Sequence, residues 1–193
     1  MSLVELWLPI VLSAVAVFIV AAVAHTVLPH HKGDWGKAPA EDDLLETLRS
    51  KGIGPGQYMF PFCTGPGELK DEAAKKRFEA GPHGTLTVWP GVPNMTRNLI
   101  LSFIFYLVVS IFVAYLGALA IDAGSFREVF RVTGTAGIMA YVLGGIPQAI
   151  WFGCSGRSLL MYIIDGIVYG LITGLIFGWL WPEVVEAALP VVG

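Results

Sequence analysis

Apolar and polar positions divide this chain into four long apolar stretches and one charged segment. The stretches are residues 6–28, 98–121, 132–152 and 159–181, and Asp165 is the one charged residue within them. Each reaches the length of roughly 20 residues that a helix needs to cross a bilayer. Because backbone groups in lipid must be satisfied within their own segment, each stretch is expected to be helical. The pattern therefore predicts four transmembrane helices.

The first stretch also has features of a signal peptide, because AVA at 22–24 resembles a cleavage site. However, MSLVE at the start contains no lysine or arginine, and the apolar core is too long for a signal peptide. We therefore expect residues 1–28 to form a retained transmembrane helix.

Charged residues concentrate between the first and second apolar stretches. Of the 27 charged residues, 18 lie between Lys32 and Arg97. Within this segment, residues 41–51 and 71–80 each begin with acids and are followed by a glycine, which is typical of short helices. Residues 57–62 and 85–89 have the composition of strands. We expect an all-α integral membrane protein with four transmembrane helices and a small α+β insert, 29–97, before a three-helix region, 98–193.

Basic residues predict the orientation of these helices. With four spans, the insert and the short loop at 153–158 share one side of the membrane, and both termini share the other. Ten of the twelve lysines and arginines lie on the insert side. The positive-inside rule then places the insert in the cytoplasm and both termini outside.

Glycines recur at every fourth position of the last apolar stretch. Residues four apart lie on one helical face, and small residues let two helices in lipid approach closely. We expect this face to pack on a small-residue stripe of the preceding helix, with Gly137 and Gly145 alongside that stripe. The helix-packing residues predicted are Gly166, Gly170, Gly174 and Gly178 on one side and Ala136, Ala140 and Gly144 on the other.

Asp165 is the candidate functional residue, since an ionisable group within a membrane span is expensive and is by default a functional hypothesis. It lies roughly 10 Å along the helix from Ser158, on the insert side. The polar residues predicted around it are Tyr162, Tyr169, Thr173, Tyr141 and Gln148. No lysine or arginine is level with it, so Tyr141, Gln148 and Tyr162 are the expected hydrogen-bond partners. A polar clamp between helices and a proton or cation site are both open interpretations.

Histidines and sulfur also gather on the insert side. The candidates are His25, His30, His31, Cys63 and His83, and imidazole and thiolate are ligands for copper or zinc. Their spacing matches no standard ligand pattern, and adjacent histidines do not share one helical face. The sequence therefore predicts no metal site and no cofactor, although these residues leave the question of metal binding open.

Composition narrows the function further. The chain is 55% hydrophobic and 14% charged with a net charge of −3, so nucleic acid is not an expected partner. It contains no phosphate-binding loop, dinucleotide fingerprint or hydrolase motif, and we do not expect an enzyme. The segments VLPHHKGDW, GQYMFPFC, LTVWPG with PNM, and FGWLWP resemble a group of bacterial membrane proteins of unknown function. The resemblance implies a bacterial inner-membrane location.

Two main functions are compatible with these features, and a third class, a metal sensor on the cytoplasmic face, is also open. The first is a non-catalytic structural or accessory subunit in the bilayer, which binds other membrane chains or a second copy of itself through small-residue faces and the insert. The alternative is a small proton- or cation-coupled transporter that uses Asp165. The first predicts a buried, hydrogen-bonded Asp165, and the second predicts that Asp165 faces a cavity.

Overall fold

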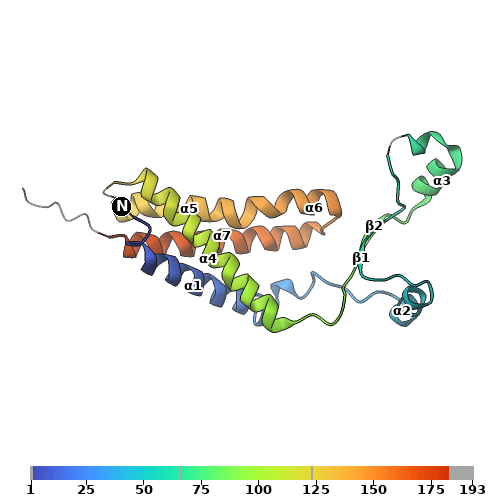
Figure 1. Ribbon diagram of the computed structural model, residues 1–193, viewed down its shortest axis with the longest axis horizontal. Coiled ribbons are helices and arrows are strands. Elements are labelled where there is room, and N and C mark those ends of the chain that lie inside the picture. The colour runs from blue at the N-terminus through green and yellow to red at the C-terminus, as the bar shows by residue number, and fades with distance from the viewer. Residues whose placement is uncertain (1, 66, 123, 183–193) are drawn as a thin grey trace, which may run out of the picture.

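Four long helices lie side by side in the computed structural model, which describes residues 2–65, 67–122 and 124–182 (Figure 1). They are α1 (Trp7–Thr26), α4 (Met95–Ala120), α5 (Phe126–Val142) and α7 (Gly156–Leu180). The short α6 (Ile146–Phe152) continues α5 through a 3-10 turn, η3 (Leu143–Gly145). Each of the four spans, with α5 to α6 counted as one, is long and apolar enough to cross a membrane. The chain is thus a mostly helical protein with four candidate membrane spans.

Local capping determines where the helices begin. The Asn94 side chain accepts from the backbone N–H of Arg97 at the start of α4. Ser125 and Glu128 form a reciprocal capping box, which starts α5 six residues before the apolar stretch that predicted it. The Ser155 side chain caps α7 by accepting from the backbone N–H of Ser158. Polar caps therefore extend the helices beyond their apolar residues.

The third span is interrupted, whereas the sequence predicted one continuous helix over 132–152. Pro147 lies in the first turn of α6, directly after η3. Proline has no backbone N–H and its ring clashes with the preceding turn, so a regular α-helical ladder cannot continue through this point. Gly153, with a φ of 75°, then ends α6 in a conformation that favours glycine.

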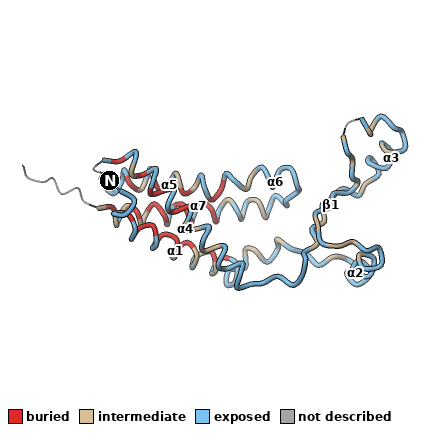
Figure 2. Tube along the Cα trace, in the orientation of Figure 1, coloured by how far each residue is buried: buried red, intermediate tan, exposed pale blue. Residues whose placement is uncertain are grey.

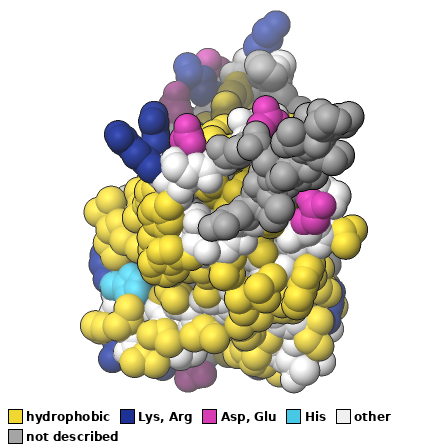
Figure 3. All heavy atoms as spheres, turned by 90° about the vertical axis from the view of Figure 1, so that its left-hand side faces the viewer, with side chains coloured by type: hydrophobic (Ala, Val, Ile, Leu, Met, Phe, Trp, Pro, Cys, Tyr) yellow, Lys and Arg dark blue, Asp and Glu magenta, His cyan; other side chains and the backbone are white. Residues whose placement is uncertain are grey.

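The core lies between the helices of the bundle, where α1 packs on α4 and α7 while α5 packs on α4 and α7. Figure 2 shows that buried residues follow the inner faces of the helices in the half away from the insert. Fully buried side chains include Val17, Val113, Val129 and Phe177. Outward-facing side chains such as Phe112 and Leu119 are exposed, and hydrophobic side chains cover much of the bundle surface in Figure 3. An apolar exterior of this kind suits a lipid environment.

The insert projects from the end of the bundle opposite the N-terminus (Figure 1). It contains α2 (Glu41–Ser50), β1 (Gly56–Phe60), the 3-10 turn η2 (Glu68–Lys70), α3 (Glu72–Ala80) and β2 (Gly84–Val88). The two strands form an antiparallel pair in which Tyr58 is opposite Leu86. The predicted strand pair is present, each strand beginning one residue earlier than expected. None of the described residues of the insert is buried, so it has little core of its own.

Candidate functional site

A short segment after α1 folds back onto α7 and brings two histidines to Asp165. Pro29 begins a 3-10 turn, η1 (Pro29–His31), immediately beyond the end of α1. His30 Nε2 lies 3.1 Å from Asp165 Oδ1, and His31 Nε2 lies 2.6 Å from Asp165 Oδ2. Asp165 is only 8% exposed. We call residues 29–35 the arm, and its histidines occupy both carboxylate oxygens of the buried aspartate.

This arrangement corrects the partners predicted for Asp165. Tyr141, Gln148 and Tyr162 were expected to bond the carboxylate, but its hydrogen bonds in the described structure go to His30 and His31. The expectation concerned lysine and arginine; the groups that lie level with Asp165 are histidines, which carry a positive charge when they are protonated. The partners lie more than a hundred residues away in the chain, and periodicity within the helices does not reveal them.

Arg157 and Ser158 attach the arm to the first turn of α7. The Arg157 guanidinium donates to Asp34 Oδ1 at 3.1 Å and to the His30 carbonyl oxygen at 2.7 Å. The Ser158 hydroxyl donates to Asp34 Oδ1 at 3.1 Å. Asp34 Oδ2 lies 2.6 Å from His31 Nδ1. His31 is therefore held between two carboxylates, Asp34 on the arm and Asp165 on α7.

The electrostatics of the arm favour an ion pair between His31 and Asp34. Burial lowers the pKa of His31, but hydrogen bonds to Asp34 and Asp165, together with their charges, outweigh burial and raise this pKa above its ordinary value. The hydrogen bond from His31 lowers the pKa of Asp34, and the Ser158 hydroxyl and the charges of His31 and Arg157 add to this against a smaller opposing effect of burial. Both pKa shifts mean that the surroundings stabilise the charged forms of His31 and Asp34.

A third histidine, His25, completes the cluster. Its ring stacks on that of His31 with centroids 4.1 Å apart and planes 15° from parallel. Its Nδ1 lies 3.0 Å from the Ala21 carbonyl oxygen. Since a carbonyl only accepts, Nδ1 carries the hydrogen and Nε2 is the acceptor of the neutral ring. One ligand atom from each of His25, His31 and Asp165 lies within 4.8 Å of the others.

Two cavities meet at this cluster. An inner cavity of about 200 Å³ is lined by aromatic residues of α4, α5 and α7 together with Asp165. An outer cavity of about 780 Å³ lies between the arm, β2 and the α6–α7 turn. His25, His31 and Tyr162 line both cavities. The histidine–aspartate cluster thus separates a space on the insert side from a space inside the bundle.

The other residues predicted around Asp165 occupy different positions. Tyr141, Tyr162 and Tyr169 line the inner cavity with Asp165. The buried hydroxyls of Tyr141 and Tyr169 have no hydrogen-bond partner among the described residues. Thr173 donates to the Tyr169 carbonyl oxygen within its own helix, and Gln148 lines the outer cavity instead. The structure therefore brings together four of the six predicted polar residues.

Among the candidate metal ligands, the structure separates two groups. His25, His30 and His31 lie at the cluster, whereas Cys63 and His83 lie in the insert beside α3. The Cys63 thiol donates to the Gly65 carbonyl oxygen, and the His83 ring packs against Phe78 with centroids 5.0 Å apart. Figure 1 shows α3 far from the helical bundle.

The α7 glycines face α5, but through a different face of α5 than predicted. A Cβ at Gly170 would lie 2.5 Å from the backbone N of Ile138, and one at Gly174 would lie 2.8 Å from Cα of Gly134. Gly166 faces Tyr141 and Val142, and Gly178 faces Phe126. The contact face of α5 thus includes Gly134, Gly137 and Ile138, and only Gly137 was noted from the sequence.

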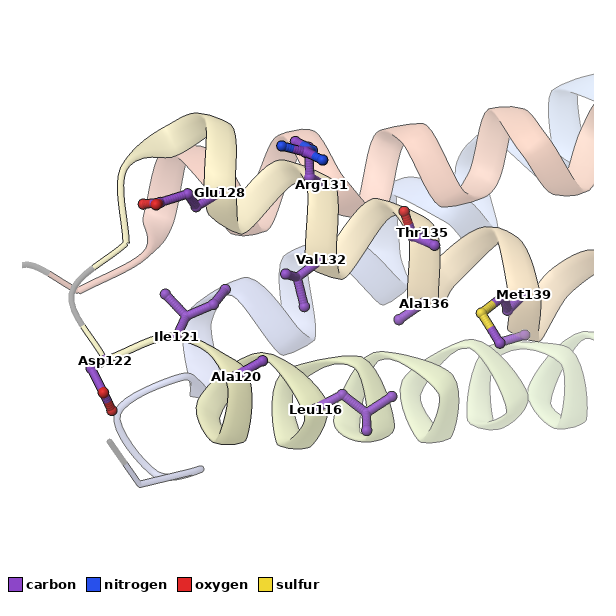
Figure 4. A pocket seen from close by; sticks show the side chains of 11 residues that line it. Leu116, Ala120, Ile121, Asp122, Glu128, Arg131, Val132, Thr135, Ala136 and Met139 are labelled. Carbon is purple, nitrogen blue, oxygen red and sulfur yellow. The ribbon is translucent and has the colours of Figure 1, made fainter.

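The predicted stripe of Ala136, Ala140 and Gly144 has other surroundings. Ala136 and Ala140 line a groove of about 1070 Å³ between α4 and α5, opposite Leu116 and Ala120 of α4 (Figure 4). A Cβ at Gly144 would have no neighbour within 4 Å. This stripe is therefore not the α7 contact.

Sequence reasoning missed His30 and His31 as neighbours of Asp165, and Asp34 as the second partner of His31. One signal was available, because Asp165 was placed in the insert-side half of the last helix and the histidines follow the insert-side end of the first. Both segments therefore lie at the same depth on the insert side, which indicates that they are neighbours.

Comparison of the chain with family models, curated proteins and solved structures finds no match.

Proposed function

We propose that this protein is a small multi-pass membrane transporter in which Asp165 binds the transported cation. The observation that carries the proposal is the position of Asp165, which lies within a candidate membrane span, bonds two histidines and lines a cavity inside the bundle. A carboxylate within a bilayer is costly and is retained mostly where ions or protons pass.

The cavities support a path on both sides of the cluster. On the insert side, the outer cavity reaches His25 and His31, which lie between it and Asp165. On the bundle side, four tyrosines line the inner cavity, and the buried Ser110 hydroxyl lies one helical turn beyond Tyr106 without a partner among the described residues. Buried polar groups without protein partners indicate sites for water or a ligand.

The direction of the path follows from the orientation proposed for the chain. Ten of the twelve lysines and arginines lie in the insert and at the start of α7. We place these parts in the cytoplasm and both termini outside, in the inner membrane of a bacterium. The outer cavity then opens to the cytoplasm, and the cation crosses the cluster between the cytoplasm and the bundle interior.

A flux assay tests the proposal. The purified chain is placed in liposomes, and entry of protons and of divalent cations is followed with trapped fluorescent indicators. We expect flux with the native chain and at least a tenfold loss with Asp165→Asn, because an amide has neither the charge nor the basicity of a carboxylate.

The matched control is Asp122→Asn, which removes another carboxylate at an exposed position between α4 and α5. It should leave flux unchanged. Absence of flux in the native chain, or equal flux in the native and Asp165→Asn chains, would contradict the proposal. Size-exclusion chromatography and circular dichroism establish that each variant is folded.

A second candidate function, a non-catalytic accessory subunit, is favoured by the buried, hydrogen-bonded Asp165 and by the α4–α5 groove. Apolar and small side chains line most of this groove, and its charged lining residues are Asp122, Glu128 and Arg131, toward the α4–α5 loop (Figure 4). Small residues allow close packing of another transmembrane helix, from a different chain or from a second copy. Purification in mild detergent at native expression tests this function, since a stoichiometric partner supports it and a lone monomer rejects it.

A further inference from the structure

We propose that the cation bound at this site is a divalent transition metal of the zinc class, with His25, His31 and Asp165 as its ligands. The inference rests on the proposed function and names the class of its substrate. The ligands come from three segments, the last turn of α1, the arm and α7, which meet only in the folded chain.

The donor set suits such an ion. Two imidazoles and one carboxylate are ligands that zinc and its neighbours bind well, whereas magnesium and calcium prefer oxygen alone. One donor atom from each of the three residues already lies within 4.8 Å of the others. Bonds of about 2.0–2.2 Å to a tetrahedral ion hold neighbouring ligand atoms roughly 3.4 Å apart, so His31 Nε2 and Asp165 Oδ2, which lie 2.6 Å apart, would separate to admit the ion. The ion would take the place of the Nε2 proton in the hydrogen bond between His31 and Asp165, and this proton would be released to solvent.

Each ligand is also oriented by a second group. His25 donates its Nδ1 hydrogen to the Ala21 carbonyl oxygen, so that Nε2 is the nitrogen left to bind the ion. Asp34 holds His31 Nδ1, and His31 Nε2 is directed at Asp165. Histidine ligands of metals characteristically donate their second ring hydrogen to a carbonyl or carboxylate in this way.

His30 orients the third ligand. Its Nε2 contacts Asp165 Oδ1, which leaves Oδ2 directed at His31. Arg157 in turn holds both Asp34 and the His30 carbonyl oxygen. Each of the three proposed ligands is therefore held by a hydrogen bond to another group, and the three lie between the two cavities.

Three protein ligands are the number expected for a site that releases its metal. Structural zinc sites use four protein ligands, whereas sites that exchange or activate a bound group keep a position open. Three ligands leave such a position, and the adjoining inner cavity of about 200 Å³ provides space for water or for the departing ion. The site is thus suited to bind a metal reversibly.

Metal binding by the full chain in mild detergent tests the inference. After dialysis against a chelator, the protein is titrated with ZnCl₂, and with CoCl₂ to record visible absorption. We expect about one equivalent of metal per chain, and cobalt bands of a low-coordinate site with nitrogen ligands. His25→Ala should weaken binding at least a hundredfold, and this variant should fold because the His25 side chain is exposed.

Two further variants distinguish the site from histidines outside it and test a residue that orients a ligand. Asp34→Asn should weaken binding about tenfold to a hundredfold, as expected for a group that orients a ligand. His83→Ala is the matched control, since His83 lies in the insert beside Phe78, and it should bind as the native chain does. Failure to bind a stoichiometric metal, or unchanged binding by His25→Ala, would overturn the inference.

Combining this titration with the flux assay distinguishes the two proposals. Flux that requires Asp165 in a chain that binds no metal overturns the metal inference and leaves a proton as the cation. Stoichiometric, His25-dependent metal binding without any flux supports the metal site and rejects the transport function.

Discussion

Arg157 joins two segments that lie far apart in the chain. Its guanidinium bonds Asp34 and the His30 carbonyl oxygen, 123 and 127 residues earlier. The Arg157 side chain is 48% exposed, so solvent screens its charge and each bond alone contributes little. Its importance is geometric, because both bonds attach the arm to the first turn of α7, about two helical turns from Asp165.

Replacing Arg157 with glutamine should therefore loosen the arm without unfolding the bundle. We expect cleavage by a lysine-specific protease at Lys32 to become roughly threefold to tenfold faster, because local opening governs proteolysis of a folded chain. Cleavage at Lys75 in α3 serves as the internal reference. Equal acceleration at both lysines, or none at Lys32, would show that Arg157 does not hold the arm.

At this scale, the sequence identifies the aspartate but not its environment. Asp165 is conspicuous because it is the one charge in four apolar stretches. The sequence does not mark its partners. His30 and His31 follow a proline outside any α-helix, and no periodicity relates them to α7. Contacts between distant segments depend on the tertiary fold, which local patterns do not encode.

At the scale of helices, the closest packing is between α5 and α7. The glycines of α7 remove side chains where the α5 backbone approaches, so the two helices gain dispersion contacts that lipid alone would not favour. Gly170 has the tightest position, because a Cβ there would lie 2.5 Å from the Ile138 backbone nitrogen.

Gly170→Ala should destabilise the protein by about 1–3 kcal/mol, the usual cost of overpacking, since the Ile138 backbone cannot move as a side chain can. Gly144→Ala is the matched control, because a Cβ at Gly144 has no neighbour within 4 Å. It should change stability by less than about 0.5 kcal/mol. Reversible unfolding in mixed micelles measures both variants, and equal stabilities would contradict the packing described.

The helices themselves are largely predictable from the sequence, but the partner face of α5 is not. Apolar length and caps mark the spans, and glycines at every fourth residue mark one face of α7. On α5, however, Gly134 and Gly137 compete with Ala136 and Ala140 as a small-residue face. Because both faces of a membrane helix are apolar, hydrophobic patterning does not choose between them.

On the scale of the whole molecule, the insert and the α6–α7 turn lie at one end of the bundle, opposite the N-terminus and the end of α7 (Figure 1). Both cysteines, Cys63 in the insert and Cys154 in the α6–α7 turn, are at the first end. The chain therefore carries native probes of its proposed orientation.

A membrane-impermeant maleimide should leave both cysteines unlabelled in intact spheroplasts and should label the exposed Cys154 in inverted vesicles. Asp122→Cys, at the opposite end, should give the reverse pattern. Labelling of Cys154 from outside would invert the proposed topology, and the outer cavity would then open away from the cytoplasm.

The central claim at every scale is that the arm closes over the start of α7 and forms one site with Asp165. Cross-linking tests it most directly, because the Asp34 carboxylate and the Ser158 hydroxyl are 3.1 Å apart. The measurement uses Asp34→Cys with Ser158→Cys in a chain whose Cys63 and Cys154 are serine, oxidised in native membranes and then cleaved between the two positions.

We expect the two fragments to remain joined until reduction, whereas fragments from Asp34→Cys with Asp122→Cys should separate. Fragments that separate equally in both pairs would contradict the docked arm, and with it the histidine–aspartate site.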